Sequence, residues 1–473
     1  MSKTASIVSA PGKALIAGGY LVLDPAYSGL VLATSARFYA IVRPSTSTTA
    51  LAAEINENAL PIIVTSPQFP SDPPRHYLVD LTGIDRPGGA SFTFRSSPPA
   101  ANKFIDNALR TALLLAHLRL GPKRFTSALP QANGIDVIVL ADNDFYSQSA
   151  SLARLGLINL CDLPKFTSPS ATIASVNKTG LGSSAALVTG IVAGVSRFFT
   201  TAQSAASPAT DMDKHGIHAA AQLAHCLAQG KIGSGFDVSS AIFGSHRYQR
   251  FDPSVLTSAM DVWTAGKHVG QVLAPLIPGL GVKLMLADVA AGSNTPALVS
   301  RVLRWRKEKG DEAERVWREI QDNNDRLVEV LEEMGKLDQD QVEREVKAWW
   351  TGEAKNGRVG FLVDRLVEIL AQNRVGMRSM GQAADVPIEP VEQTKLLDAC
   401  IEVSGVLGAG VPGAGGYDAI FILYIDHPTV HANLTRALSG FANVTPLLCE
   451  ASAEGIKDES ETAVELAEFQ QYL

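Results

Sequence analysis

A run of glycine and serine near the middle of the chain has the composition of an anion-binding loop. It reads Val176-Asn177-Lys178-Thr179-Gly180-Leu181-Gly182-Ser183-Ser184-Ala185-Ala186-Leu187 and precedes apolar residues at helical spacing. The first amides of a helix have no intrahelical acceptor and lie at the positive end of its dipole. The run therefore predicts a phosphate site, with Ser183 and Ser184 as the residues that cap the helix. An ordinary glycine turn that ends in a serine cap is the alternative.

The loop does not follow the Walker pattern, because no Gly-Lys-Ser/Thr closes it. A cation and the ligands of a metal ion must therefore come from elsewhere. Lys13 is a candidate, since it lies between two apolar runs, 6–10 and 14–23, where an unpaired ammonium is costly to bury. A surface lysine on a hairpin turn is the other interpretation of the same residues.

Two further segments are rich in glycine. The first, Gly230-Lys231-Ile232-Gly233-Ser234-Gly235-Phe236-Asp237, places three glycines within six residues before an acidic residue. Asp237 is therefore either a rigidly framed functional carboxylate or the cap of the next helix. The second segment, 408–418, has five glycines in nine residues, so its backbone must come close to a ligand or to another strand.

The totals describe a globular protein of at least two domains. The chain has 473 residues, of which 46% are hydrophobic and 19% charged, and its net charge of −7 with no long basic run argues against a nucleic-acid binder. Its four scattered cysteines indicate reduced thiols. No apolar stretch approaches the ~20 residues of a membrane span, and no signal peptide or retention signal is recognised, so we expect a cytoplasmic protein without membrane contact.

The pattern of the chain predicts the elements that position these residues. Strands are expected at 6–10, 14–23, 30–43, 61–65, 77–81, 134–140, 171–176, 281–289 and 419–425. Helices are expected at 102–118, after Ser183, at 215–229, through much of 297–382 and at 394–404. The first domain is expected to end between 244 and 271.

Three separated segments, Ala10-Pro11-Gly12-Lys13, 178–187 and 410–421, together resemble the three motifs of the GHMP kinases. Their ordered spacing covers nearly the whole chain. The resemblance implies an α+β fold of two domains, over 1–250 and 251–473. The first would be like domain 2 of ribosomal protein S5, and the second ferredoxin-like with helical insertions.

Within that family the chain looks most like the fungal and eukaryotic type of phosphomevalonate kinase. The similar segments are 229–238, 288–296, and Pro387-Ile388-Glu389-Pro390 with Gln393-Thr394. Mevalonate kinase has a metal-binding Glu where this chain has His225. Because an imidazole cannot replace that carboxylate on Mg²⁺, the ion would rely on ATP phosphates, Ser184 and water, with Asp237 contributing.

The resemblance implies transfer of the γ-phosphoryl group of ATP to 5-phosphomevalonate, with Lys13 and Asp237 as catalytic residues. ATP would bind Lys178, Thr179, Gly180, Leu181, Gly182, Ser183, Ser184 and Ala185, with Ser184 on Mg²⁺. The acceptor would bind Lys13, Lys103, Lys231, Ser234, Gly235, Asp237, Ser293, Thr295 and Gly415. Which of the two serines contacts the metal, and whether Asp237 acts as a base or an orienting group, are left open.

Two other functions fit the same residues. One is another GHMP kinase, such as mevalonate kinase. The other is a non-catalytic sensor that binds nucleotide and ligand, although such a sensor has no need of Lys13 and Asp237. A monomer and a homodimer are equally compatible with the sequence.

Overall fold

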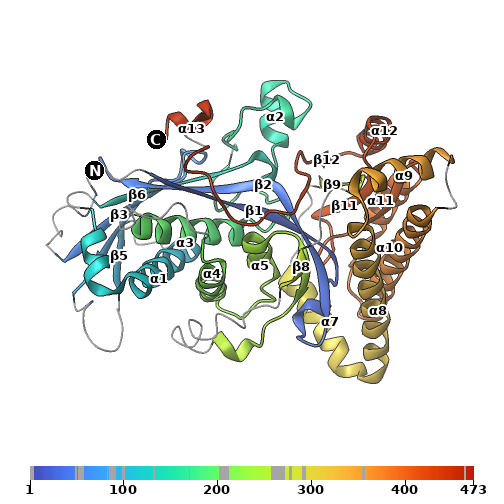
Figure 1. Ribbon diagram of the computed structural model, residues 1–473, viewed down its shortest axis with the longest axis horizontal. Coiled ribbons are helices and arrows are strands. Elements are labelled where there is room, and N and C mark those ends of the chain that lie inside the picture. The colour runs from blue at the N-terminus through green and yellow to red at the C-terminus, as the bar shows by residue number, and fades with distance from the viewer. Residues whose placement is uncertain are drawn as a thin grey trace.

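The computed structural model describes most of the chain. The described residues are 5–47, 49, 51, 58–82, 84, 92–97, 102–130, 134–169, 171–201, 212–256, 272–275, 280–289, 295–353, 357–462 and 465–472. Within them the chain forms two sheets, each with its own helices (Figure 1).

The first sheet is built around two long strands, β1 (Ser6–Ala17) and β2 (Ser28–Pro44), which pair antiparallel. Its main order is β14 (Lys457–Asp458)-β1-β2-β6-β3-β4-β5, and among the described strands only β3 and β6 pair in parallel. The other strands are β3 (Ala59–Thr65), β4 (Arg75–Asp80), β5 (Thr93–Ser97), β6 (Ile135–Ala141), β7 (His246–Gln249) and β8 (Val272–Pro275). The two runs expected at 6–10 and 14–23 are thus largely one strand, which ends at Ala17.

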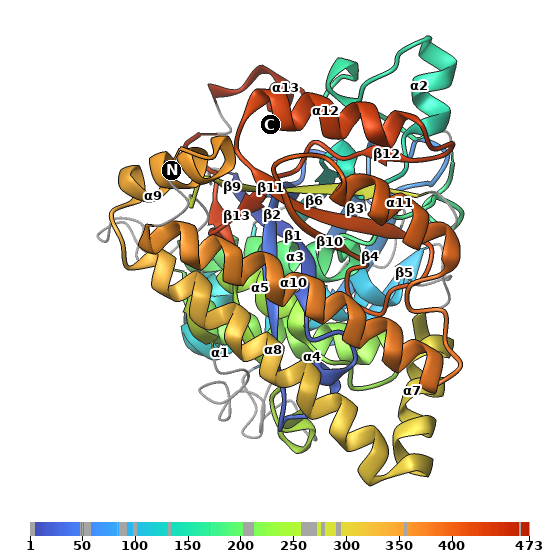
Figure 2. The ribbon, with the colours of Figure 1, turned by 90° about the vertical axis from the view of Figure 1, so that its right-hand side faces the viewer.

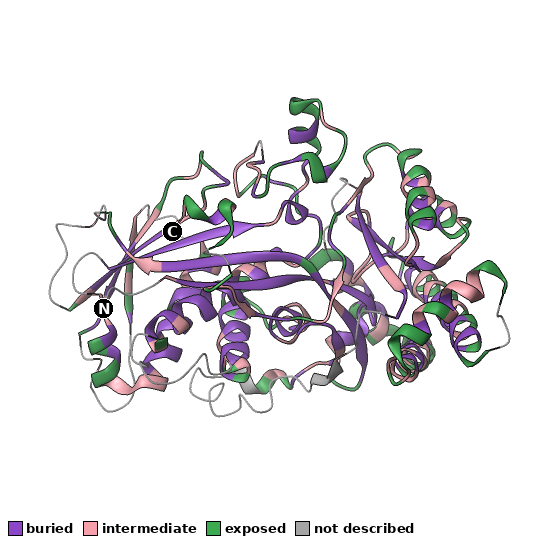
Figure 3. Cartoon of the chain, turned by 45° about the horizontal axis from the view of Figure 1, so that its top comes forward, coloured by how far each residue is buried: buried purple, intermediate pink, exposed green. Residues whose placement is uncertain are grey.

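Helices cover one face of this sheet (Figure 1). They are α1 (Lys103–Ala128), α3 (Ser183–Thr201), α4 (Lys214–Gln229) and α5 (Phe236–Phe243). The short helix α2 (Ser149–Leu155) lies on the other side. By length and composition α3 is apolar enough to cross a bilayer, but 72% of it is buried in the fold, as expected of a core helix. Figure 3 shows the buried strands above this helical layer.

The second sheet has the order β10-β11-β9-β12. Its strands are β9 (Val282–Asp288), β10 (Val406–Gly410), β11 (Ala419–Ile425) and β12 (Thr445–Pro446). The helices are α7 (Thr295–Lys309), α8 (Asp311–Gly335), α9 (Gln339–Thr351), α10 (Arg358–Ala383), α11 (Val391–Ile401) and α12 (Pro428–Ser439). Figure 2 shows α8 and α10 side by side, and α10 packs on β10.

The end of the chain returns to the first sheet, which the sequence did not predict. Strand β13 (Ala451–Ser452) pairs with β2, and β14 (Lys457–Asp458) pairs with β1. The terminal helix α13 (Ala467–Gln470) places Phe469 against Tyr39 of β2. The first sheet therefore includes residues from both ends of the chain, and the predicted domain bounds of 1–250 and 251–473 stay a prediction.

Candidate active site

Lys13 lies where β1 departs from regular pairing. The register with β2 shifts between Pro11 and Lys13, as in a β-bulge, which re-aims a side chain. The Lys13 amide donates to the carbonyl of Leu181 at 2.9 Å, and its Nζ donates to the carbonyl of Gly180 at 2.7 Å. The lysine of the first motif is thus bonded to the glycine loop of the second.

The segment before the glycine loop forms turns, whereas the sequence predicted a strand there. Residues 171–176 form no strand, so that expectation is wrong. The amides of Ala185 and Ala186 donate to the carbonyl of Gly182, which therefore stands at the N-cap. Ser183 and Ser184 are the first residues of α3 itself, so their expected role as caps is also wrong.

Both the backbone conformation at position 182 and the closeness of neighbouring side chains favour a glycine there. Its φ of +74° lies in the left-handed region. A β-carbon on Gly182 would stand 3.0 Å from Cε of Lys13 and 3.7 Å from Cβ of Asp237. The glycine thereby lets the lysine and the aspartate converge at the mouth of α3.

Asp237 is the second residue of α5 and is partly buried. Its Oδ1 accepts from the amide of Val238 at 3.0 Å. Burial lowers the pKa of Lys13, whereas the negative charges of Asp237 and Asp418 act to raise it. The Lys13 ammonium also lies 5.5 Å from the ring of Phe236. The lysine is therefore a partly desolvated cation, and the negative charges of two carboxylates stabilise its charged form.

His225 of α4 connects the helix mouth to this aspartate. Its Nε2 lies 3.0 Å from Oγ of Ser184 and 3.9 Å from Oδ2 of Asp237. The ring of Phe104 packs on it with the centroids 5.6 Å apart. The imidazole thus holds the Ser184 hydroxyl beside the carboxylate.

The oxygen ligands available at this loop fit a magnesium ion that is bound together with a nucleotide. Among the described residues no group of three or more His, Cys, Asp or Glu could hold a metal. One hydroxyl, of Ser184, and one carboxylate, of Asp237, lie at the loop. Mg²⁺ typically takes one or two protein oxygens and completes its shell with phosphate and water. Ser184 and Asp237 are therefore the residues that could hold it.

The other residues predicted for ATP differ in their setting. The Thr179 hydroxyl donates to the backbone carbonyl of Asp144, so it faces the protein. Leu181 and Ala185 are buried, whereas Lys178 is exposed. The loop thus presents its backbone to the site.

The other residues predicted for the acceptor differ in their exposure and in their hydrogen bonds. Lys103, at the start of α1, and Lys231 are exposed, as is Thr295 at the start of α7. The carbonyls of Ser234 and Gly235 accept from Tyr248 and Gln222. Ser293 lies outside the described residues.

The third glycine-rich segment packs against β1. The amide of Gly413 donates to the carbonyl of Leu15 at 3.0 Å, and the Tyr20 hydroxyl donates to the carbonyl of Ala414 at 2.6 Å. Gly415, predicted to bind the acceptor, donates its amide to the carbonyl of Pro412. The segment brings Asp418 close enough for its charge to act on Lys13. Sequence reasoning missed this carboxylate, although its position two residues after Gly416 was a signal.

This two-domain architecture, with a lysine at a glycine loop and a helix N-terminus, defines the class of GHMP kinases. The model "GHMP kinases C terminal" matches residues 362–441. Streptococcus pneumoniae phosphomevalonate kinase in complex with phosphomevalonate and AMPPNP has the same fold, with a TM-score of 0.59 at 15% identity. The match covers 94% of this chain and 99% of that one. Methanococcus jannaschii mevalonate kinase has a TM-score of 0.52 at 14% identity, covering 94% and 98%.

Relatives in sequence show which family within this class the chain belongs to. The chain is 34% identical to the peroxisomal phosphomevalonate kinase of Arabidopsis thaliana, over 96% of both chains. It is 37% identical to phosphomevalonate kinase erg8 of Aspergillus fumigatus, over 90% of this chain and 88% of that one. The chain therefore belongs to the phosphomevalonate kinase family.

Proposed function

We propose that the chain transfers the γ-phosphoryl group of ATP to (R)-5-phosphomevalonate, giving (R)-5-diphosphomevalonate and ADP. This reaction belongs to the mevalonate pathway of isoprenoid and sterol synthesis. The observation that carries the proposal is the Lys13 ammonium, 2.7 Å from the carbonyl of Gly180 in the loop that begins α3. The near-full-length similarity to phosphomevalonate kinases supports the choice of acceptor.

The reaction brings two phosphate groups together, so the site must neutralise charge and align the groups. We assign Lys13 to the position between the donor and acceptor phosphates. The backbone amides of 180–184 hold the β- and γ-phosphates at the helix N-terminus. Ser184, with Asp237, would hold Mg²⁺, which when bound would offset phosphate charge.

Asp237 has little proton to remove from this acceptor. A phosphate monoester has a second pKa of about 6, so at pH 7 it is mostly ionised. We therefore propose that Asp237 orients Lys13 and removes only the residual proton. Its position across Gly182 from Lys13 supports this role.

Lys103, Lys231, Ser234, Gly235, Ser293, Thr295 and Gly415 are our candidates for recognition of the acceptor. They would contact its phosphate and its carboxylate, which lie at opposite ends of a short chain. Alanine variants of the two lysines should raise the KM of the acceptor and leave the KM of ATP unchanged.

An assay of ADP release tests the function directly. The protein is supplied with ATP and Mg²⁺, and with either 5-phosphomevalonate or mevalonate. Turnover with 5-phosphomevalonate alone supports the proposal, whereas turnover with mevalonate alone makes the chain a mevalonate kinase. Binding of both ligands without ADP release identifies a sensor.

We propose a cytoplasmic location and a monomer or homodimer. The plant relative's name places that protein in the peroxisome. Imaging of the tagged chain with a peroxisomal marker tests the location, and light scattering tests the assembly.

A further inference from the structure

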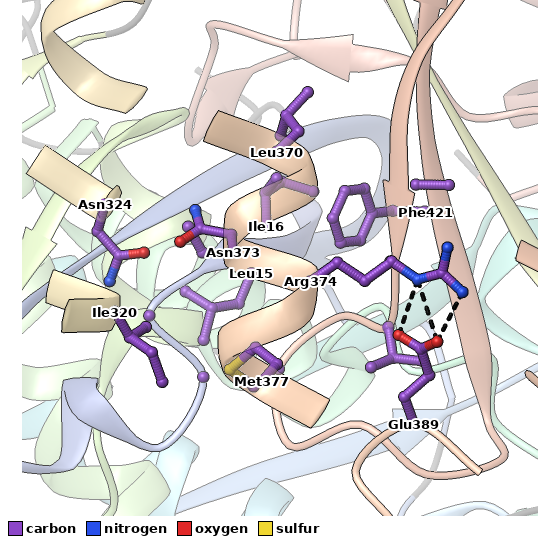
Figure 4. A pocket seen from close by; sticks show the side chains of 17 residues that line it. Leu15, Ile16, Ile320, Asn324, Leu370, Asn373, Arg374, Met377, Glu389 and Phe421 are labelled. Atoms are coloured by element: carbon purple, nitrogen blue, oxygen red, sulfur yellow. Dashed lines mark hydrogen bonds and ion pairs between the residues drawn. The ribbon is translucent and has the colours of Figure 1, made fainter. Parts of the chain in front are cut away.

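The signature Pro387-Ile388-Glu389-Pro390, between α10 and α11, contains a carboxylate held from several sides. The Glu389 side chain is 1% exposed. Arg374 of α10 donates from Nε to both of its oxygens at 3.0 Å and from a terminal nitrogen at 2.7 Å (Figure 4). The Thr394 hydroxyl donates to the same carboxylate at 3.0 Å. Such charge-assisted bonds fix the position of a side chain.

The residue before Glu389 is in contact with the third glycine segment. The carbonyl of Ile388 accepts from the amide of Gly416 at 2.8 Å. A β-carbon on Gly415 would lie 2.2 Å from that same oxygen. The two backbones therefore touch, and the position of Ile388 sets the position of this segment.

The glycine segment in turn contacts β1 near the catalytic lysine. Gly413 bonds to the carbonyl of Leu15, which is two residues beyond Lys13. A continuous set of contacts thus runs from Arg374 through Glu389 and Ile388 to the strand that holds the lysine.

A small cavity adjoins these contacts (Figure 4). Its volume is about 30 Å³, and Gly19, Gly413, Arg374 and Glu389 are among its lining residues. Asn373 lines it as well, and neither polar atom of that side chain has a hydrogen-bond partner among the described residues. A cavity of this size with the polar atoms of Asn373 in its lining can hold a water molecule. Because close packing does not fill this side of the segment, its position depends on the polar contacts.

We propose that Glu389, held by Arg374 and Thr394, is a positioning residue for phosphoryl transfer. It fixes the 413–416 segment, and with it the acceptor side of the cleft facing Lys13. This inference rests on the proposed function, and it gives the Pro387–Pro390 signature a role. Misplacement of about 1 Å can cost 10²-fold in rate, so the effect should be large.

Glu389→Gln tests the proposal because it removes the charge and keeps the shape. We expect kcat/KM for 5-phosphomevalonate to fall about a hundredfold, while the KM of ATP stays within about twofold. Asp398→Asn is the matched control. Asp398 also pairs with Arg374, at 2.7 Å, but its side chain is 56% exposed, and among the described residues this ion pair does not involve the Pro387–Pro390 signature. This control should keep wild-type kinetics.

Hydrogen exchange supplies a readout that does not depend on turnover. The amide of Gly416 should exchange faster in Glu389→Gln and at the wild-type rate in Asp398→Asn. If Glu389→Gln does not fold, Thr394→Val, which removes one bond to the carboxylate, should give the same changes in weaker form. Wild-type kinetics and exchange in a folded Glu389→Gln, or in a folded Thr394→Val, would overturn the proposal. An inactive wild-type protein with the expected exchange pattern would instead overturn the proposed function.

Discussion

At the scale of residues, the chemistry depends on a lysine whose charge is costly to maintain. Lys13 is desolvated by the fold, and two carboxylates, Asp237 of α5 and Asp418 just before β11, offset that cost. Its ammonium must also be free to face phosphate, and among the described residues its one hydrogen bond goes to a backbone carbonyl.

Removal of this ammonium should slow the transfer without unfolding the protein. We expect Lys13→Met to lower kcat by about 10²–10³-fold, as for the loss of one preorganised donor to a charged transition state. Steady-state kinetics with both substrates measures the effect, and circular dichroism controls for folding. A kcat near the wild-type value in a folded variant would contradict the assigned role.

Asp418 should affect the pH at which Lys13 loses its charge. Activity requires the ammonium, so it falls as pH rises through the pKa of Lys13, which burial holds below 10.5. Because Asp418 acts to raise that pKa, Asp418→Asn should move the alkaline limb of kcat/KM to lower pH. Asp418→Glu keeps the charge and should move it less. An unshifted limb in Asp418→Asn would show that the carboxylate does not act on the lysine.

Substitution of Asp237 should change the pH profile in another way, because we propose that Asp237 removes the residual proton of the acceptor phosphate. The acceptor phosphate loses that proton above a pH of about 6. If Asp237 removes it, Asp237→Asn should lose most rate at low pH and least at high pH. A profile of kcat against pH from 5.5 to 9 distinguishes this from pure orientation, for which the loss is the same at every pH.

At the scale of elements, the sequence predicted contacts between motifs better than it predicted their conformation. Glycine and serine before an apolar helical pattern indicated the start of α3 correctly, because that signal is local. The β-branched residues of 171–176 indicated a strand that does not form, because strand formation depends on a partner edge, which no local pattern specifies. The approach of Asp418 to Lys13 required both sheets to be in place.

Gly182 provides a test of how the loop and the lysine are fitted together. Gly182→Ala adds a β-carbon 3.0 Å from Lys13, in a left-handed conformation. Gly156→Ala is a control matched for strain, because its φ is +67° and nothing lies within 4 Å of the added atom. Each change costs about 1 kcal/mol of stability for its backbone. Only Gly182→Ala should lower kcat/KM, by tenfold or more on the scale of such misplacements; equal kinetics in the two variants would contradict the fit.

At the scale of the whole molecule, the two sheets are joined by polar contacts as well as by the glycine segment. Arg306 of α7 bonds to Asp24 of the first domain at 2.8 Å and to Glu314 at 2.9 Å. Its guanidinium lies 3.7 Å from the ring of Trp317, which packs edge-on against Tyr27. The chain order gave no sign of this junction, nor of the return of β13 and β14 to the first sheet, because both join residues hundreds of positions apart.

This junction should weaken in acid and in the absence of Arg306. The hydrogen bond from Tyr27, then the bond and charge of Arg306, hold the pKa of Glu314 below its ordinary value of 4.5. A lowered carboxyl pKa gives stability that is present above pH 4.5 and lost as pH falls through the folded pKa.

Arg306→Ala removes the cation shared by two carboxylates and its stacking on Trp317, which contribute about 1–3 kcal/mol together. We expect a lower melting temperature for the first calorimetric transition and a shift in tryptophan fluorescence. The stability of the variant should also depend less on pH below 4.5. Arg318→Ala is the control, because Arg318 is 66% exposed and its pairing distance to Glu314, 3.9 Å, is longer than the 2.9 Å of Arg306. Equal melting of the two variants would show that Arg306 does not hold the domains together.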